Sequence, residues 1–256
     1  MLAGRKLVDF RGPLGWKASC VGTGRSEAVI SPTQNRVEGV NVEGISVEAR
    51  LRHVLPLIEL RVPFELPRSQ LAEYDRGARD ADFDPVMEAA RKIAIVENHL
   101  IFDGYAAAGI RGICEAAPDP ASGAGSGRPG TSFNDYPVLS ATAMTKLRDR
   151  GIDGPYAVAL GEQAYTDLTD ATNEGYPVLQ HVRRLVDGPL ISTPGLNGAV
   201  VLSLRGGDFE LTSGQDFSIG YLSHDSDNVR LYIEESVTFW NIEPKAAVTL
   251  FAPAAQ

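Results

Sequence analysis

The sequence predicts an α+β fold in which a compact block of short elements is inserted into a flatter, elongated domain. Residues 58–66 alternate apolar and polar side chains, which is typical of a strand with one buried face. Residues 84–108 have the spacing of one long helix that stops at Gly109. Between residues 136 and 222, short helical stretches alternate with short apolar strands. The mixed block therefore lies between two outer stretches of strand and long helix.

The beginning of the chain is expected to be extended. Gly4 to Asp9 is predicted to be a short strand that places Arg5, Leu7 and Asp9 on one face. Residues 25–52 carry β-branched residues among polar ones and glycines, which predicts a two-stranded arm. An isolated two-stranded ribbon is marginal in water, so this arm should lie on another surface, and a neighbouring subunit is one candidate.

The first long strand and the long helix have clear boundary signals. Pro63 interrupts the strand's hydrogen-bonding pattern and favours the edge of a sheet. The helix starts at Asp84-Pro85, an acidic residue followed by a proline suited to the first turn. Its inward stripe is apolar or small with one exception, Glu97.

The second half of the chain is divided by turn residues. A stretch rich in Pro, Gly, Ser and Ala at 118–130 is the best candidate for an internal boundary. At the C-terminal end, alternation resumes from Val229 to Phe239, and Glu235 interrupts its apolar face. The remaining predictions are helices at 137–150, 162–172 and 177–186, and strands at 156–160, 199–204, 217–221 and 246–251.

Composition excludes several classes of protein. The chain has 256 residues and a formal net charge of −9, and its longest basic cluster is Arg183-Arg184. Proteins that coat nucleic acid need many clustered cations, so no nucleic-acid partner is expected. No apolar run reaches the length of about 18 residues needed for a membrane span, and no secretory signal is recognisable. Cys20 and Cys114 are far apart, which suits a reducing cytoplasm, where we expect the protein to reside.

No sequence motif predicts catalysis. The four histidines lack metal-ligand spacing, and the Gly-rich stretch at 123–127 lacks the lysine of a phosphate loop. Asp225, Asp227, Glu234 and Glu235 could form a paired-carboxylate hydrolase site, but solvated loop and strand charges are the favoured interpretation. We therefore predict that the chain is not an enzyme and has no catalytic, cofactor-binding or metal-binding residues.

Several segments, in order along nearly the whole chain, resemble those of a known family. The chain is similar to the shell proteins of encapsulin nanocompartments, specifically the family 1 or linocin and bacteriocin type. Each motif is weak alone, and the set is specific. The matching segments are Gly4 to Trp16, Leu57 to Phe64, Asp75 to Gly77, Glu97 to Gly104, Gly151 to Tyr156, Arg205 to Phe209, Gly220-Tyr221 and Val229 to Tyr232.

This resemblance implies the tailed-phage major capsid protein fold, with a peripheral domain, an axial domain and an extended arm. Residues 1–24 and 53–135 would form the peripheral domain with its spine helix. The arm would be 25–52 and the axial domain 136–222. Residues 223–256 would return to the peripheral domain as its last strands.

The resemblance also implies function. The chain would assemble with copies of itself into an icosahedral shell around a cargo enzyme, a peroxidase or a ferritin-like protein, that docks through a C-terminal targeting peptide. Haem or iron would then belong to the cargo alone. A phage or prophage major capsid protein is the alternative interpretation, and a secreted peptidase or bacteriocin is a more distant one.

Specific residues follow from the same resemblance. Arg5, Leu7 and Asp9 match positions near the cargo groove, to which a preceding luminal helix contributes in family members; this chain begins almost at the opening motif, so we expect either a shortened subunit or a start further upstream. The pore-lining residues would be Thr172, Asn173, Glu174, Gly175 and Tyr176 at the five-fold opening, and Asp187, Gly188 and Pro189 near the three-fold opening. Glu174 and Asp187 would favour small cations.

Overall fold

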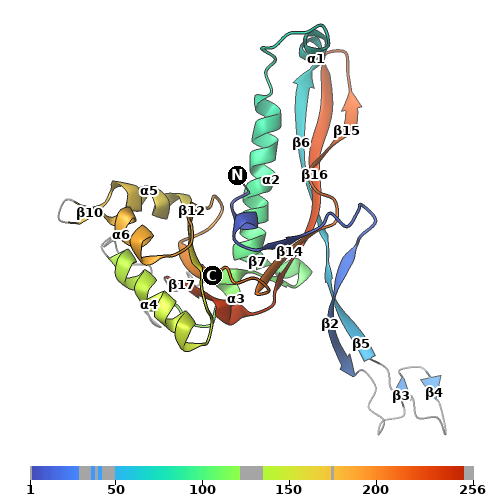
Figure 1. Cartoon of the computed structure of the whole chain (residues 1–256). Coiled ribbons are helices and arrows are strands. Elements are labelled where there is room, and N and C mark those ends of the chain that lie inside the picture. The colour runs from blue at the N-terminus through green and yellow to red at the C-terminus, as the bar shows by residue number, and fades with distance from the viewer. Residues whose placement is uncertain are drawn as a thin grey trace.

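The computed structural model describes residues 2–28, 36–37, 40–41, 50–121, 135–173 and 176–250. These residues form a tall lobe, a side lobe and a projecting ribbon (Figure 1). The helices are η1 (Gly4–Lys6), α1 (Arg68–Asp75), α2 (Asp84–Phe102), η2 (Ala106–Ala108), α3 (Ile113–Ala116), α4 (Asp135–Asp149), α5 (Glu162–Asp170), α6 (Val178–Leu185) and η3 (Pro244–Ala246).

The strands run from one end of the chain to the other and form two larger sheets and several short pairs. They are β1 (Asp9–Arg11), β2 (Cys20–Ala28), β3 (Arg36–Val37), β4 (Val40–Asn41), β5 (Arg50–Pro56), β6 (Ile58–Pro67), β7 (Gly104–Tyr105), β8 (Ile110–Arg111), β9 (Tyr156–Leu160), β10 (Thr172–Asn173), β11 (Tyr176–Pro177), β12 (Leu190–Ser192), β13 (Ala199–Ser203), β14 (Phe209–Ser213), β15 (Ser218–His224), β16 (Asn228–Asn241) and β17 (Ala247–Thr249).

The tall lobe consists of a five-stranded sheet with the long helix α2 packed against it (Figure 1). β16 is its central strand, with β6 antiparallel along one side and β15 and β14 antiparallel along the other. β1 adds to β14 as a parallel neighbour. Phe64 and Leu66 of β6 are buried with Ala89 and Ile93 of α2 and Ile233 of β16. The predicted alternation of the strand at 58–66 is confirmed, because its apolar face packs under the helix.

Two boundary predictions in this lobe are confirmed. α2 starts at Asp84, with Pro85 in its first turn, although the N-cap position expected for Asp84 is occupied by Phe83. β6 pairs with β16 alone among the described strands, with Pro63 opposite Tyr232, so the proline lies on an edge strand.

The end of α2 differs from the prediction. The helix stops at Phe102 and not at Ala108, because Gly104 turns the chain with a φ of +84° into the β7–β8 hairpin. A Cβ atom at Gly104 would lie 2.5 Å from both the amide nitrogen of Gly112 and the carbonyl oxygen of Ile110. This close backbone approach requires glycine, and the helical spacing of the following residues could not reveal it.

The predicted strand over residues 4–9 is wrong. Gly4–Lys6 forms a short 3₁₀ helix, and the strand covers only Asp9–Arg11. The amide of Gly4 donates a hydrogen bond to Asn98 Oδ1 at 2.8 Å, and a Cβ atom there would lie 2.6 Å from Ile101 Cδ1. The chain is thereby held against α2 in a turn, and not extended beside another strand.

The side lobe is a four-stranded sheet in the order β12-β9-β13-β17, with β9 and β12 parallel and the other pairs antiparallel. Every residue of β9 and β13 is buried. The helix α4 packs against β13 and β17, and α5 packs against β9. The predicted helices and strands of residues 137–204 therefore appear with ends shifted by a few residues at most.

The sheet pairings do not follow the boundary predicted at residue 222. Strands from both sides of that boundary pair with each other in each of the two larger sheets. β14 and β15 belong to the tall lobe as partners of β16, and β17 belongs to the side lobe as a partner of β13. Leu211 of β14 lies opposite Phe239. Val248 of β17 lies opposite Val201, and all four side chains are almost fully buried. Long-range burial decides these pairings, and local periodicity carries no information about it.

The ribbon is formed by β2 and β5, which run antiparallel from Cys20 and Pro56 out to Ala28 and Arg50. It projects away from both lobes (Figure 1). Most side chains of β5 are exposed, including Leu51 and Val54. The two described ends of the predicted arm, 25–28 and 50–52, are thus extended, and the ribbon reaches beyond 25–52 to Cys20 and Pro56. Apart from these two ends and the β3–β4 pair, the predicted arm lies outside the described residues.

Candidate docking site and pore-lining residues

A buried ionic cluster fixes the N-terminal segment to the tall lobe. Arg5 Nε donates to Glu97 Oε2 of α2 at 2.6 Å. Its two terminal nitrogens donate to Asp216 Oδ1 and to Glu235 Oε2 of β16, each at 2.9 Å. The side chains of Glu97 and Glu235 are fully buried, whereas that of Asp216 is 40% exposed. One guanidinium therefore serves three carboxyl groups from three parts of the chain.

This arrangement perturbs the two buried carboxyl groups. Burial, and after it the neighbouring Glu97 carboxylate, raise the pKa of Glu235 to about 9 against the opposing effect of Arg5. Burial likewise raises the pKa of Glu97 above its usual range. The Oε1 atoms of both glutamates are buried without another hydrogen-bond donor among the described residues. The cluster is thus richer in acceptors than in donors when both carboxyl groups are ionised.

The expectation that the acidic residues near the C-terminal strand are solvated holds for Asp225 and Asp227, which are both exposed. Asp225 accepts from the amides of Asp227 and Asn228 in an exposed turn. Glu234 is only 14% exposed and pairs with Arg61, which is 44% exposed.

The expectation is wrong for Glu235, whose side chain points inward from β16 into the cluster. The sequence carried a signal for this cluster, because Glu97 and Glu235 are the two carboxylates that interrupt predicted apolar faces. What could not be predicted was that they meet.

The three predicted docking residues have different surroundings. Arg5 lies between two aromatic rings, 4.7 Å from the centroid of Phe10 and 5.3 Å from that of Phe217. Leu7 is buried in the core. Asp9 is exposed, and its Oδ2 accepts from the amide of Gly207 at 2.6 Å. Leu7 and Asp9 both line a small polar cavity of about 150 Å³ next to β14.

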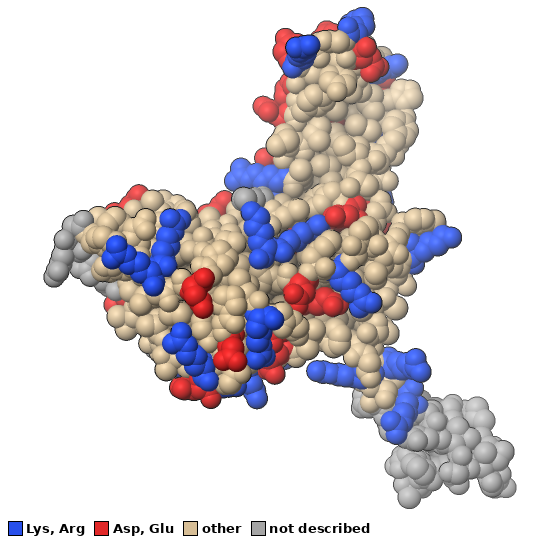
Figure 2. Space-filling model, viewed as in Figure 1, with Lys and Arg blue, Asp and Glu red and all other residues tan. Residues whose placement is uncertain are grey.

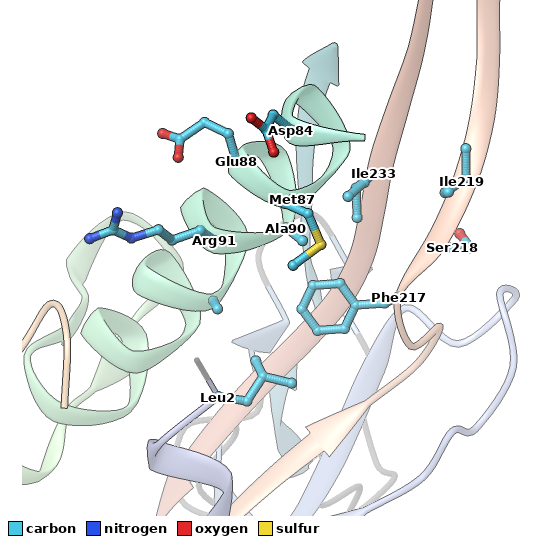
Figure 3. Close-up of a pocket in the computed structure, with 11 residues that line it drawn as sticks. Leu2, Asp84, Met87, Glu88, Ala90, Arg91, Phe217, Ser218, Ile219 and Ile233 are labelled. Carbon is cyan, nitrogen blue, oxygen red and sulfur yellow. The ribbon is translucent and has the colours of Figure 1, made fainter. Parts of the chain in front are cut away.

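A larger apolar pocket of about 1000 Å³ lies beside Arg5, on the tall lobe. Met87, Phe217 and Leu2 face a common space in it, whereas Glu88 and Arg91 extend away from that space (Figure 3). The guanidinium group of Arg5 lies over the ring of Phe217, and this contact connects the ionic cluster to the wall of the pocket. The lining residues are Leu2, Asp84, Met87, Glu88, Ala90, Arg91, Ala94, Phe217, Ser218, Ile219 and Ile233.

Of the predicted five-fold pore residues, Thr172, Asn173 and Tyr176 lie at the far end of the side lobe, where β10 pairs with β11 (Figure 1). Thr172 lies opposite Pro177, and Asn173 lies opposite Tyr176. The Tyr176 ring is 4.8 Å from the ring of His181, centroid to centroid. Glu174 and Gly175 fall outside the described residues.

The predicted three-fold residues form the turn between α6 and β12. Asp187 is exposed at its surface, yet its Oδ1 accepts from the amide of Tyr156 at 2.7 Å. A Cβ atom at Gly188 would lie 2.4 Å from the carbonyl oxygen of Tyr156, so this turn packs directly on β9. The Pro189 carbonyl accepts from Val158. The three residues therefore lie in one turn, and the carboxylate of Asp187 also helps to hold this turn against β9.

Other possible sites are weak. Within the described ranges, no group of three His, Cys, Asp or Glu side chains could hold a metal ion. Burial raises the pKa of the Cys114 thiol, which is the opposite of activation for nucleophilic attack. No helix among the described residues is long and apolar enough to cross a membrane. Basic and acidic side chains are interspersed over the face shown in Figure 2.

Comparison with solved structures supports the fold. A virus-like particle protein of Pyrococcus furiosus has a TM-score of 0.58 at 17% identity, covering 96% of this chain and 90% of its own. A chain of the solved structure of Mycobacterium phage Che8 has a TM-score of 0.55 at 15% identity, covering 96% and 89%. A chain of the capsid of an empty GTA particle has a TM-score of 0.57 at 11% identity, covering 98% and 97%. The chain therefore has the tailed-phage major capsid protein fold.

Comparison of sequences gives the family. A type 1 encapsulin shell protein of Rhodospirillum rubrum is 52% identical, with 97% of this chain and 86% of the relative covered. A type 1 encapsulin shell protein of Mycobacterium tuberculosis is 42% identical, with 97% and 88% covered. The Linocin_M18 family model, described as "Encapsulating protein for peroxidase", matches residues 1–238. The chain thus belongs to this family, the self-assembling shell proteins of encapsulin nanocompartments.

Proposed function

We propose that the shell formed by this chain takes up a peroxidase-type cargo enzyme through a C-terminal targeting peptide, and that the peptide docks in the apolar pocket of the tall lobe. The open pocket beside Arg5 is the observation that carries the proposal. Its walls are apolar side chains that would otherwise face water, with Met87 67% and Ile219 60% exposed. Exposed apolar surface of this size favours a partner that covers it.

The chemistry of the pocket suits a short peptide with apolar side chains and some charge. Met87 adapts its shape readily to different apolar partners. Asp84 also lines the pocket and offers a carboxylate to polar groups of the peptide, whereas Glu88 and Arg91 extend away from the pocket space. A peptide added here would bury the exposed faces of α2 and β15 together.

In this proposal the predicted docking residues contribute to different degrees. Arg5 is occupied by three carboxyl groups, so it acts by holding Phe217 in the pocket wall. Leu7 supports the segment from within the core. Asp9 is exposed near the small polar cavity, where it offers a carboxylate to the peptide.

The docking proposal is tested by co-expression with a peroxidase carrying its C-terminal extension. The variant Ile219→Glu places a charge in the pocket wall. The matched control Leu222→Glu changes an exposed apolar residue of the same strand that does not line the pocket. We expect particles from both variants, with cargo lost from Ile219→Glu alone. Cargo retained by Ile219→Glu particles at the wild-type level would contradict the docking site.

Small cations are proposed to enter through openings lined by Glu174 and Asp187. Carboxylate rings attract cations in pores, which supports this assignment. Cation entry can be followed in shells loaded with a metal-quenched fluorescent cargo. Glu174→Gln should slow quenching by Co²⁺, whereas Glu162→Gln, on an exposed part of α5, should not. Equal rates in wild type and Glu174→Gln would contradict the role of Glu174.

The shell is further proposed to be a cytoplasmic, non-catalytic container that needs no nucleic acid, metal or cofactor of its own. The names of the relatives, which are shell proteins, support this assignment. The test is to measure peroxidase and peptidase turnover of empty particles beside cargo-loaded ones. Turnover should require the cargo, and activity of the empty shell would contradict the proposal.

A further inference from the structure

The buried carboxyl groups of Glu97 and Glu235 do not line the pocket proposed for cargo docking. They project from the centre of α2 and from the central strand of the tall lobe, and each is fully buried. A single guanidinium, that of Arg5, bonds to both through their Oε2 atoms. Apolar residues at these two positions would avoid the large desolvation cost of burying charge. The pair is therefore a candidate for a role other than stabilising the fold.

We propose that Glu97 and Glu235 share one proton, and that this carboxyl pair is a pH-sensitive lock joining the N-terminal segment to α2 and β16. If both groups were ionised, Arg5 would face three negative charges, two of them buried. One proton held between the two glutamates removes the repulsion and supplies the donor that the Oε1 atoms lack.

Three charged groups act on the carboxyl group of Glu235. Glu97 comes from α2, Arg5 from η1 and Asp216 from the loop before β15, and these are the groups whose charges affect its pKa. The neighbouring strand β6 presents Leu60 in register with it. Glu234 on the same strand pairs with the exposed Arg61. No second cation from these elements therefore relieves the pair.

The direction of the pH effect follows from the sign of the shift. The pKa of Glu235 is raised from 4.5 to about 9, so the folded protein keeps a proton that the unfolded chain releases. The stabilisation is complete below the unfolded value, and it is lost progressively as the pH rises to about 9. Alkaline solution should therefore loosen the joint between the N-terminal segment and the tall lobe.

Infrared spectroscopy of the assembled wild-type shell tests the shared proton directly. A protonated carboxyl C=O band should be present at neutral pH and disappear with a midpoint near pH 9. It should be absent from Glu235→Gln and from Glu97→Gln, since either remaining carboxylate would pair with Arg5 unopposed. Asp216→Asn should keep the band and move its midpoint to lower pH. A wild-type shell without the band, or a band kept by both single variants, would overturn the proposal.

Thermal unfolding tests the lock. The melting temperature of the wild type should fall more steeply than that of Glu235→Gln between neutral pH and pH 10. The control Glu234→Gln changes the adjacent carboxylate, which pairs with the exposed Arg61. Its melting temperature should fall with pH as steeply as that of the wild type, with the same difference between the two proteins at every pH. Parallel slopes in wild type and Glu235→Gln would contradict the lock. If Glu235→Gln does not fold, the infrared titration of the wild type alone decides the matter.

Discussion

At the scale of single residues, Arg5 is the most constrained side chain of the described N-terminal segment. Its side chain is 14% exposed and bonds to three carboxyl groups. Family resemblance predicted it as a docking residue, but its contacts show a structural role as well. A substitution here would therefore affect the folded subunit before it affects any cargo.

The variant Arg5→Leu should destabilise the subunit by ~3–5 kcal/mol, because it leaves the buried negative charge of the Glu97–Glu235 pair without its counter-ion. Denaturant unfolding of the purified protein measures this loss. The control Arg11→Leu removes an exposed arginine that approaches Glu210 only to 3.9 Å, and it should cost less than ~1 kcal/mol. Similar losses for the two variants would show that the cluster contributes little.

Residue-scale predictions from sequence succeeded where the residue type alone decides the outcome. Pro63 on an edge strand and Pro85 in a first helical turn follow from the missing amide of proline. Glu97 and Glu235 were visible as exceptions on apolar faces. Their meeting around Arg5 depends on the packing of three distant segments, so it could not be predicted from any one of them.

At the scale of elements, the end of α2 is set by backbone packing. Gly104 has a positive φ and meets the backbone of the facing strand, so Gly104→Ala should cost at least ~1–2 kcal/mol from its backbone conformation alone. Thermal unfolding measures this cost. Gly22→Ala is the matched control, since a Cβ atom there meets nothing within 4 Å, and its effect should stay within ~0.5 kcal/mol. An equal effect at both glycines would contradict this account of the helix end.

The ribbon of β2 and β5 is the element that the lobes do not cover. Val54 of β5 is 51% exposed. If a neighbouring subunit covers it, Val54→Asp should leave subunit stability within ~0.5 kcal/mol of wild type and weaken assembly. The particle fraction on dilution, followed by size-exclusion chromatography, measures this. Val138→Asp, on an exposed face of α4, is the control. Unchanged particle stability in Val54→Asp would mean that Val54 lies outside the subunit interface.

Helices and strands were predicted correctly where the local sequence decides the structure, and wrongly where contacts with another element decide it. The strand at 156–160 was found because it is a short continuous apolar run, and the start of α2 because Pro85 suits the first helical turn. The 3₁₀ turn at 4–6 was missed because contacts with Asn98 and Ile101 override the extended pattern. Propensity is a weak guide wherever a segment packs closely on another element.

At the scale of the whole molecule, two lobes and a ribbon are connected by crossing strands. β14 and β15 lie in the tall lobe although their sequence follows the side lobe, and β17 returns to the side lobe at the end. Composition and periodicity predicted a compact insert in an elongated domain. The family resemblance supplied the capsid fold, and no local pattern specified which distant strands would pair.

Native mass measurement of the purified full-length protein tests the central claim most directly, that this chain closes into a shell by burying its ribbon and exposed faces against copies of itself. With a subunit of 27.5 kDa, the account predicts a particle in the megadalton range composed of many identical chains. A species that remains monomeric or dimeric at every concentration tested would contradict it.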